Sequence, residues 1–191
     1  FNEAKVLVVG DIILDTYCSG SVNRISPEAP VPIVEQKNVT NRLGGAANVA
    51  LNLASLGVDV GLMGIVGKDS NAQTVRNLLA SASIHAHLII SSDTPTVNKI
   101  RISVDNHQMM RIDIEELYCG SCVSEMQVSF DEQIHNYDVV IFSDYAKGTL
   151  NCISSLISTC NKHLKISIVD PKGSDCKKYG GASFVTPNLK E

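Results

Sequence analysis

The order of apolar and polar positions predicts a chain that alternates between strands and helices. Residues 5–9 are a short apolar run, KVLVV, of the kind that forms a strand buried on both faces. Further strands are expected at 60–66, 86–90, 138–142, 165–169 and 183–185. Helices are expected directly after Gly45 and at 70–81, 124–135 and 150–161. This alternation predicts βαβ units, and therefore an α/β fold with a mostly parallel sheet flanked by helices.

Two segments interrupt the alternation and are expected to form a small antiparallel β lid. Residues 16–42 hold short alternating runs and three prolines, at 27, 30 and 32. Because proline lacks the N–H that a strand ladder needs, the run PVPIVE at 30–35 is expected at a sheet edge or in the lid. Residues 96–114 alternate on both sides of Asp105-Asn106, which suits a two-residue hairpin turn. We therefore predict one core over 1–191 with lid segments at about 16–42 and 96–114.

Composition excludes several classes of protein. The chain has 191 residues, of which 44% are hydrophobic and 19% charged, which is ordinary for a globular protein. The net charge is -4 without a basic block, which argues against nucleic acid as the main partner. No apolar run is long enough to cross a membrane, and the N-terminus lacks the pattern of a secretory signal. A cytoplasmic protein without a membrane partner is expected.

The six cysteines raise the question of a disulfide framework or a zinc site. They are Cys18, Cys119, Cys122, Cys152, Cys160 and Cys176. Only the run CGSC at 119–122 has metal-type spacing, and no second CxxC or paired histidine motif completes four ligands. Because a cytosolic compartment keeps thiols reduced, we expect free cysteines.

A glycine-rich stretch at 42–50, RLGGAANVA, predicts a tight turn that leads into a helix, and Gly57 suits the C-terminal end of that helix. The first N–H groups of a helix can receive anions or hydroxyl groups. The alternative is a close-packed turn without a ligand. Asn48 favours a ligand, because an Asn one turn inside an apolar helix is expected to be buried and to need polar partners, which a polyol would provide.

Polar residues follow the predicted strands at their carboxyl ends. They are Asp11, Asp144, Asp170 and Asn188, with Asp15 shortly after Asp11, and Lys147 and Lys172 close to an Asp. The carboxyl ends of parallel strands share one edge of the sheet, so these groups are expected to converge. Carboxylates and amides for hydroxyls or Mg²⁺, with lysines for phosphate, indicate a phosphorylated polyol or a phosphoryl-transfer site. Each residue alone could instead be a helix cap or turn former.

Several motifs resemble the ribokinase-like (PfkB) carbohydrate kinases along the whole chain. The run GDIILD at 10–15 is similar to the family's sugar-binding segment, and GGAAN at 44–48 to its first signature. The run TPNLKE at 186–191 ends on the family's N-x-x-E motif, which organises Mg²⁺ and the nucleotide phosphates. The resemblance implies a ribokinase-like fold and ATP and Mg²⁺ as cofactors. A nicotinamide-dependent dehydrogenase is the first rival, but no G-x-G-x-x-G follows the first strand.

Three further runs are similar to the subgroup of the family that phosphorylates heptose 7-phosphate in the synthesis of ADP-heptose for the lipopolysaccharide core. They are RISPEAPVP at 24–32, SDYAKG at 143–148 and DPKG at 170–173. The resemblance implies ATP-dependent transfer to the anomeric hydroxyl of heptose 7-phosphate. A non-catalytic module that binds a sugar phosphate or serves in assembly is the second rival.

The resemblance also implies roles for individual residues. The sugar would be bound by Asp15, Gly44, Gly45, Asn48, Asp144 and Lys147, and its phosphate by Arg24, Lys99 and Arg101. Lys172 would lie near the transferred group, and Asp170, Asn188 and Glu191 would act on the nucleotide and Mg²⁺, the last two through water. The alternative for the cations is that they are solvated on a hairpin face.

One motif of the family is absent from this sequence. The second signature, G-A-G-D, carries the base that deprotonates the acceptor hydroxyl, and no such run occurs up to Glu191. The chain therefore resembles the N-terminal part of a kinase domain, without an adenylyltransferase domain, and the 191-residue chain is expected to be inactive by itself. The related kinases pair through their lids, so a homodimer is expected.

Overall fold

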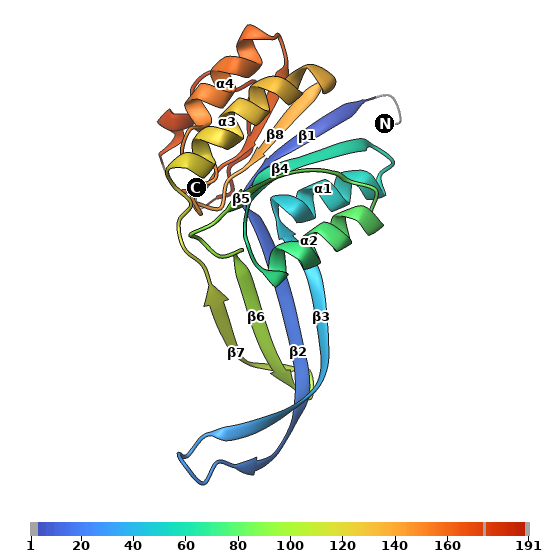
Figure 1. The fold of residues 1–191 in the computed structure, drawn as a ribbon, viewed down its shortest axis with the longest axis vertical. Helices are drawn as coiled ribbons and strands as arrows, with labels where there is room; N and C mark the ends of the chain where they lie inside the picture. The colour runs from blue at the N-terminus through green and yellow to red at the C-terminus, as the bar shows by residue number, and fades with distance from the viewer. Residues whose placement is uncertain (1–3, 174, 190–191) are drawn as a thin grey trace.

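The computed structural model describes residues 4–173 and 175–189, which form a body and a lid (Figure 1). In the body the described strands form a six-stranded sheet in the order β10-β9-β8-β1-β4-β5, and every neighbouring pair is parallel. Its strands are β1 (Lys5–Gly10), β4 (Asp59–Gly67), β5 (His85–Ser91), β8 (Val139–Ser143), β9 (Ile166–Asp170) and β10 (Phe184–Val185). The parallel sheet expected from the sequence is confirmed.

Helices cover both faces of the body sheet. On one face lie α1 (Ala46–Ser55) and α2 (Ser70–Ser81), and on the other α3 (Ser121–Gln133) and α4 (Ile153–Lys162). Two short 3-10 helices, η1 (Ile134–Asn136) and η2 (Cys176–Tyr179), follow α3 and β9. Among the described residues no helix is both long and apolar enough to cross a membrane. All six cysteines are free thiols, as expected.

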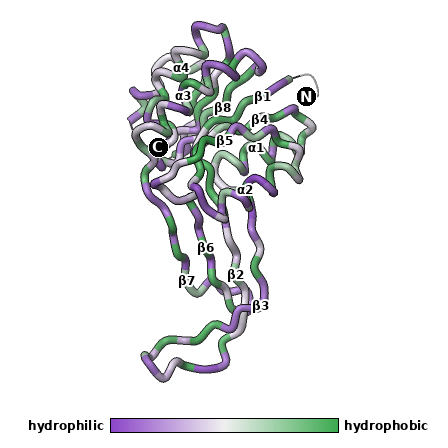
Figure 2. Tube along the Cα trace, in the orientation of Figure 1, coloured by the Kyte–Doolittle hydropathy of each residue, from purple (hydrophilic) through white to green (hydrophobic). Residues whose placement is uncertain are grey.

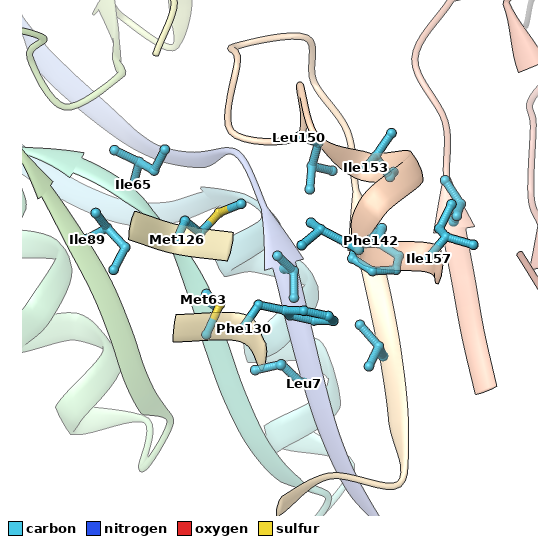
Figure 3. Packing of buried hydrophobic residues seen from close by; sticks show 14 of the residues in the cluster. Leu7, Met63, Ile65, Ile89, Met126, Phe130, Phe142, Leu150, Ile153 and Ile157 are labelled. Atoms are coloured by element: carbon cyan, nitrogen blue, oxygen red, sulfur yellow. The ribbon is translucent and has the colours of Figure 1, made fainter. Parts of the chain in front are cut away.

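The core consists of two layers because successive side chains of a strand point to opposite faces. Leu7 of β1 belongs to the cluster under α3 and α4, whereas Val8 belongs to the cluster under α1 and α2. Figure 3 shows the first cluster, whose labelled members include Leu7, Met63, Phe130 and Phe142. The rings of Phe130 and Phe142 lie 6.0 Å apart and tilted, a favourable aromatic arrangement. Strands covered on both faces explain the continuous apolar runs of the sequence.

The lid is a second sheet of four described strands in the order β3-β2-β6-β7. They are β2 (Ile12–Ile25), β3 (Pro32–Gly45), β6 (Asn98–Val104) and β7 (His107–Ile114). The prediction of an antiparallel lid is wrong for one pair, because β2 and β6 are parallel. Both strands leave the same edge of the body, β2 after β1 and β6 after β5, so they run in the same direction (Figure 1). The lid is therefore a mixed sheet.

Most element boundaries agree with the expected ones. The body strands lie within one residue of their predicted positions, and α2 spans 70–81 as expected. Its N-cap is Asp69, whose carboxylate accepts a hydrogen bond of 2.8 Å from the N–H of Ala72. Asp105 and Asn106 have φ angles of 47° and 65°, as a two-residue hairpin turn requires. Two of the lid strands extend beyond the predicted segment 16–42, because β2 begins at Ile12 and β3 continues to Gly45.

Candidate functional site: a cationic pocket between body and lid

The candidate site lies where β2 and β3 pass from the body into the lid. Gly45 has a φ of 55°, and a Cβ there would collide with the backbone oxygen of Asp11. This glycine turns the chain into α1, whose first N–H, from Ala46, donates to the same oxygen at 2.9 Å. Gly44 lies beside Asp15, and a Cβ at Gly44 would occupy the place of the Asp15 carboxylate. Because these two residues have no Cβ, the Asp15 side chain fits beside the turn that leads into α1.

A pocket of about 480 Å³ opens at this junction. Six of the residues expected to bind substrate line it, namely Asp15, Gly44, Gly45, Asn48, Lys99 and Arg101. Sequence reasoning missed four polar lining residues, which are Tyr17, Arg42, Arg111 and Tyr145. The pocket therefore combines four cationic side chains with one carboxylate, which suits a ligand that carries both an anionic group and hydroxyl groups.

Asp15 and Arg101 form the central ion pair of the pocket. Nη1 of Arg101 lies 2.5 Å from Oδ1 of Asp15, and both side chains are largely shielded from water. This hydrogen bond raises the pKa of Arg101, so the guanidinium stays charged. Arg101 and Arg42 also lie over the ring of Tyr17, at 5.2 and 5.0 Å from its centre. Cation–π contacts of this kind hold both guanidinium groups against one aromatic ring of the pocket.

A chain of ion pairs joins the lid to the loop after β8. Nζ of Lys99 lies 3.2 Å from Asp113 and 3.3 Å from Glu115. Nζ of Lys147 approaches Glu115 from that loop at 2.8 Å. The hydrogen bond from Lys147 and the one from Lys99 lower the pKa of Glu115, although partial burial acts in the opposite direction. Lys147, which is not among the described pocket-lining residues, therefore reaches the pocket through Glu115 and Lys99.

Asp11 has a structural task that the sequence did not show. Its fully buried carboxylate accepts hydrogen bonds from the N–H groups of Tyr145 (2.8 Å), Lys147 (3.1 Å) and Thr149 (3.2 Å). Burial raises the pKa of Asp11, and the backbone hydrogen bonds partly offset that rise. The carboxylate shapes the loop that carries Tyr145 into the pocket.

Asp144 is held by the protein and does not appear among the described pocket-lining residues. It is 4% exposed and accepts hydrogen bonds of 2.7 Å from Nζ of Lys178 and from the hydroxyl of Tyr179. Its backbone N–H donates to the carbonyl of Asp170 at 3.0 Å, so these strand ends do meet at one edge, as expected. Lys178 and Tyr179 were missed because nothing in their local sequence marks them as partners of residue 144.

The remaining expected site residues lie apart from the pocket or differ in exposure. Asn48 is exposed, so the expectation that it is buried is wrong; Ala46 and Ala47 of the same turn are buried in the core, whereas Asn48 lines the pocket. Arg24 is exposed and pairs with Ile33 in the outer part of the lid. The backbone N–H of Lys172 donates to the Tyr179 hydroxyl at 3.0 Å. Glu191 lies outside the described residues.

A β-bulge explains why Arg111 could not be foreseen. The hairpin turn places Val104 opposite His107, but a register shift between Ile102 and Ser103 moves the next pairs by one residue. Arg101 therefore lies opposite Arg111, and Lys99 opposite Asp113. Side chains two residues apart share one face of a strand, so all these charges face the pocket side together.

Three comparisons place this geometry among known proteins. A family model described as pfkB family carbohydrate kinase matches residues 3–191. The chain is 42% identical over 191 residues to the Bifunctional protein HldE of Actinobacillus pleuropneumoniae serotype 5b (strain L20), and 44% identical to that of Histophilus somni (strain 129Pt). Each match covers 100% of this chain and 40% of the relative. The chain thus spans well under half the length of these relatives.

The fold has counterparts among solved structures. The tetrameric inhibited form of phosphofructokinase-2 from Escherichia coli matches with a TM-score of 0.74 at 19% identity. The match covers 98% of this chain and 62% of that one. At this identity the likeness shows a shared fold, which is the ribokinase-like α/β fold expected from the sequence.

Proposed function

The chain belongs to the pfkB family of carbohydrate kinases, and from this premise we propose that the junction pocket binds a sugar phosphate, heptose 7-phosphate, as the acceptor of a phosphoryl group from ATP. The reaction would phosphorylate the anomeric hydroxyl on the route to ADP-heptose and the lipopolysaccharide core. The observation that carries the proposal is the meeting of Arg42, Lys99, Arg101 and Arg111 with the single carboxylate of Asp15 in one pocket.

The cations suit a sugar that already carries a phosphate. An unphosphorylated sugar gives such groups nothing to neutralise, whereas a phosphate can accept charge-assisted hydrogen bonds from several of them. Lys99 and Arg101 are now paired with carboxylates, at 3.2 and 2.5 Å. A bound phosphate would compete for these cations, and Asp15 would then be able to accept a hydrogen bond from a sugar hydroxyl. Asn48 and the glycine pair would complete the hydroxyl contacts.

The strand ends beside the pocket offer oxygen ligands of the kind that Mg²⁺ prefers. Asp170 ends β9, and Asn188 follows β10, which pairs with β9 in parallel. Asp170 and Asn188 would act on the nucleotide and Mg²⁺, Asn188 through water, and Lys172 would lie near the transferred group. When bound, ATP supplies the phosphoryl group and Mg²⁺ balances its charge. The chain's own residues would bind and orient the acceptor.

Binding of the sugar phosphate is the direct test. Calorimetry with heptose 7-phosphate and with unphosphorylated heptose should show a clear preference for the phosphate. Arg101→Ala should weaken the binding of heptose 7-phosphate by about 1.5–3 kcal/mol, or roughly 10–150-fold, because a charge-assisted contact is lost. Arg76→Ala, on α2 and outside this pocket, is the matched control and should bind like the wild type.

Equal affinity for heptose 7-phosphate and heptose would contradict the proposal that the cations of the pocket bind the phosphate of the sugar. Binding that is intact in a longer chain showing no transfer from ATP would favour the non-catalytic sugar-phosphate module instead. One observation supports this alternative. Every described lining residue lies at or before Tyr145, so no described residue after Tyr145 lines the pocket.

The lid is proposed to pair with the lid of a second copy. Its outer strand β7 is exposed at every residue, and Met109 is 51% and Ile112 44% exposed. So thin a sheet cannot bury both of its faces by itself. Sedimentation should show a homodimer at tens of micromolar, and Met109→Asp should shift it toward the monomer. A wild-type chain that sediments only as a monomer would contradict the pairing.

A further inference from the structure

A pair of cysteines lies in the connector between the lid and the body. The connector, residues 115–120, runs from the end of β7 at Ile114 to the start of α3 at Ser121. Cys119 lies in it and Cys122 in the first turn of α3. We propose that Cys119 and Cys122 are a redox-active dithiol that closes to a disulfide when a hydroperoxide oxidises Cys119. This inference does not depend on the kinase activity.

The two thiols are arranged for an exchange within one turn. Sγ of Cys122 donates to the carbonyl oxygen of Cys119 at 3.0 Å, so it is folded back onto the connector. Both residues line one small cavity of about 100 Å³. Cys119 is exposed and open to an oxidant, whereas Cys122 is buried and open mainly to its neighbour. An exposed attacking thiol beside a buried resolving one is the arrangement that redox-sensing pairs need.

Gly120, one of the two residues between them, leaves the backbone room to adjust. Gly120 has a φ of 65°, and no atom lies within 4 Å of the place a Cβ would take. A change in the backbone angles of Gly120, which closing a disulfide would need, meets no steric obstacle at that position. Among residues 4–173 and 175–189, no group of three or more His, Cys, Asp or Glu side chains could hold a metal ion. Thiol chemistry is therefore the use that this spacing suits.

The other cysteines are less suited to this reaction. Burial raises the pKa of Cys160 to about 12 and also raises that of Cys152, so both thiols stay protonated. These two lie eight positions apart along α4 and its N-cap, more than two turns away from each other. Cys18 lies on β2 in the lid and Cys176 in η2. Only the pair at 119 and 122 combines exposure with proximity.

The chemistry needs one hydroperoxide for each pair. The Cys119 thiol loses its proton, and the thiolate attacks the terminal oxygen of the hydroperoxide. The O–O bond breaks, Cys119 becomes a sulfenic acid, and the departing alkoxide takes up that proton and leaves as an alcohol, or as water from hydrogen peroxide. The Cys122 sulfur then attacks the Cys119 sulfur. The S–S bond forms, the S–O bond breaks, and the departing hydroxide takes the Cys122 proton to become water. Two thiols and one hydroperoxide thus give one disulfide, one alcohol and one water.

The position of the pair connects it with the pocket. Tyr118, next to Cys119, is fully buried, and its N–H donates to the carbonyl of Lys147 at 2.9 Å. Glu115, at the other end of the connector, binds Lys99 and Lys147. A disulfide would restrain the body end of this connector and reduce its motion. We therefore expect slower amide exchange in 115–120 after oxidation.

Thiol counting on the 191-residue chain tests the proposal. After treatment with hydrogen peroxide, the number of cysteines that iodoacetamide can alkylate under denaturing conditions should fall from six to four. The chain should lose two hydrogens in mass, and dithiothreitol should restore all six thiols. Peptide mapping should place the bond between residues 119 and 122.

Variants separate this bond from others. Cys18→Ser, the matched control, should still form it, whereas Cys119→Ser and Cys122→Ala should not. Because Cys122 is buried, circular dichroism must show that both variants remain folded. If Cys122→Ala does not fold, the test relies on Cys119→Ser, which replaces an exposed residue. Six alkylated cysteines after oxidation, or a disulfide that maps to other cysteines or to a second chain, would overturn the proposal.

Discussion

The body and the lid are both β-sheets, but different forces stabilise them. In the body, β4 is buried at every residue after Asp59, whereas β7 in the lid is exposed at every residue. Figure 2 shows the same contrast, with apolar strands concentrated in the body and polar residues interspersed along the lid. Burial of apolar surface stabilises the body. The lid depends on backbone pairing and on ion pairs such as Lys99 with Asp113, which contribute little each.

The difference explains why the pocket lies where the two sheets meet. A buried sheet can hold groups in fixed positions, as Asp11 holds the loop of Tyr145. A thin exposed sheet can carry many charges without the penalty of burying them. The body therefore fixes the positions of pocket residues such as Tyr145, and the lid contributes most of the charged side chains of the pocket. Three predictions test this contrast, from the largest expected effect to the smallest.

Removing one ring from the body should cost far more than removing one apolar side chain from the lid. Phe142 is 0% exposed and Ile112 44% exposed. We expect Phe142→Ala to lower the free energy of unfolding by about 3–5 kcal/mol, through lost burial and the cavity left behind. Ile112→Ala should change it by no more than about 0.5 kcal/mol in the monomer. Urea unfolding of both variants measures this, and similar losses would refute the contrast.

Removing the carboxylate of Asp11 should break the link between the body and the pocket. Asp11→Ala leaves three backbone N–H groups in a buried region without their acceptor, which should cost roughly 2–4 kcal/mol of unfolding free energy. Asp175→Ala is the control, because among the described residues that exposed carboxylate accepts a hydrogen bond from one N–H, that of Lys177. It should cost less than about 1 kcal/mol. If the two variants lost equal stability, the loop would not depend on Asp11.

Removing the carboxylate of Asp69 should lower the free energy of unfolding by a smaller amount, and that amount should depend on pH. Burial acts to raise its pKa, but hydrogen bonds from Thr96 and Ala72 outweigh it, and the pKa lies below the usual 3.8. The charged form therefore stabilises the folded state. This contribution is full above the unfolded pKa and disappears as the pH falls through the lowered folded value.

The variant Asp69→Ala should therefore lose about 1–2 kcal/mol at pH 7, as expected for a helix cap. The difference in unfolding free energy between this variant and the wild type should stay constant from pH 7 to 5 and become smaller below about pH 4. Unfolding curves at these pH values provide the measurement. A difference in unfolding free energy that grows as the pH falls would show that the pKa of Asp69 is not lowered in the folded state.

Much of the fold followed from local sequence, because hydrophobic period, caps and turns act over a few residues. The apolar runs placed the body strands within one residue, and Asp69 marked the start of α2. Asp105 and Asn106 marked the lid hairpin. Part of the pocket was also accessible, since Asp15 and the glycine pair follow directly from the ends of strands and the start of a helix.

The rest was decided only when distant segments met. The parallel pairing of β2 with β6 arises because two body strands leave the same edge, which no local pattern records. A one-residue bulge in β6 and β7 set Arg111 opposite Arg101. Asp144 met Lys178 and Tyr179 across more than thirty positions, and Asn48 turned out to be exposed. Local energetics determined which elements form, whereas register and long-range pairing, which depend on the whole chain, determined which side chains share the pocket.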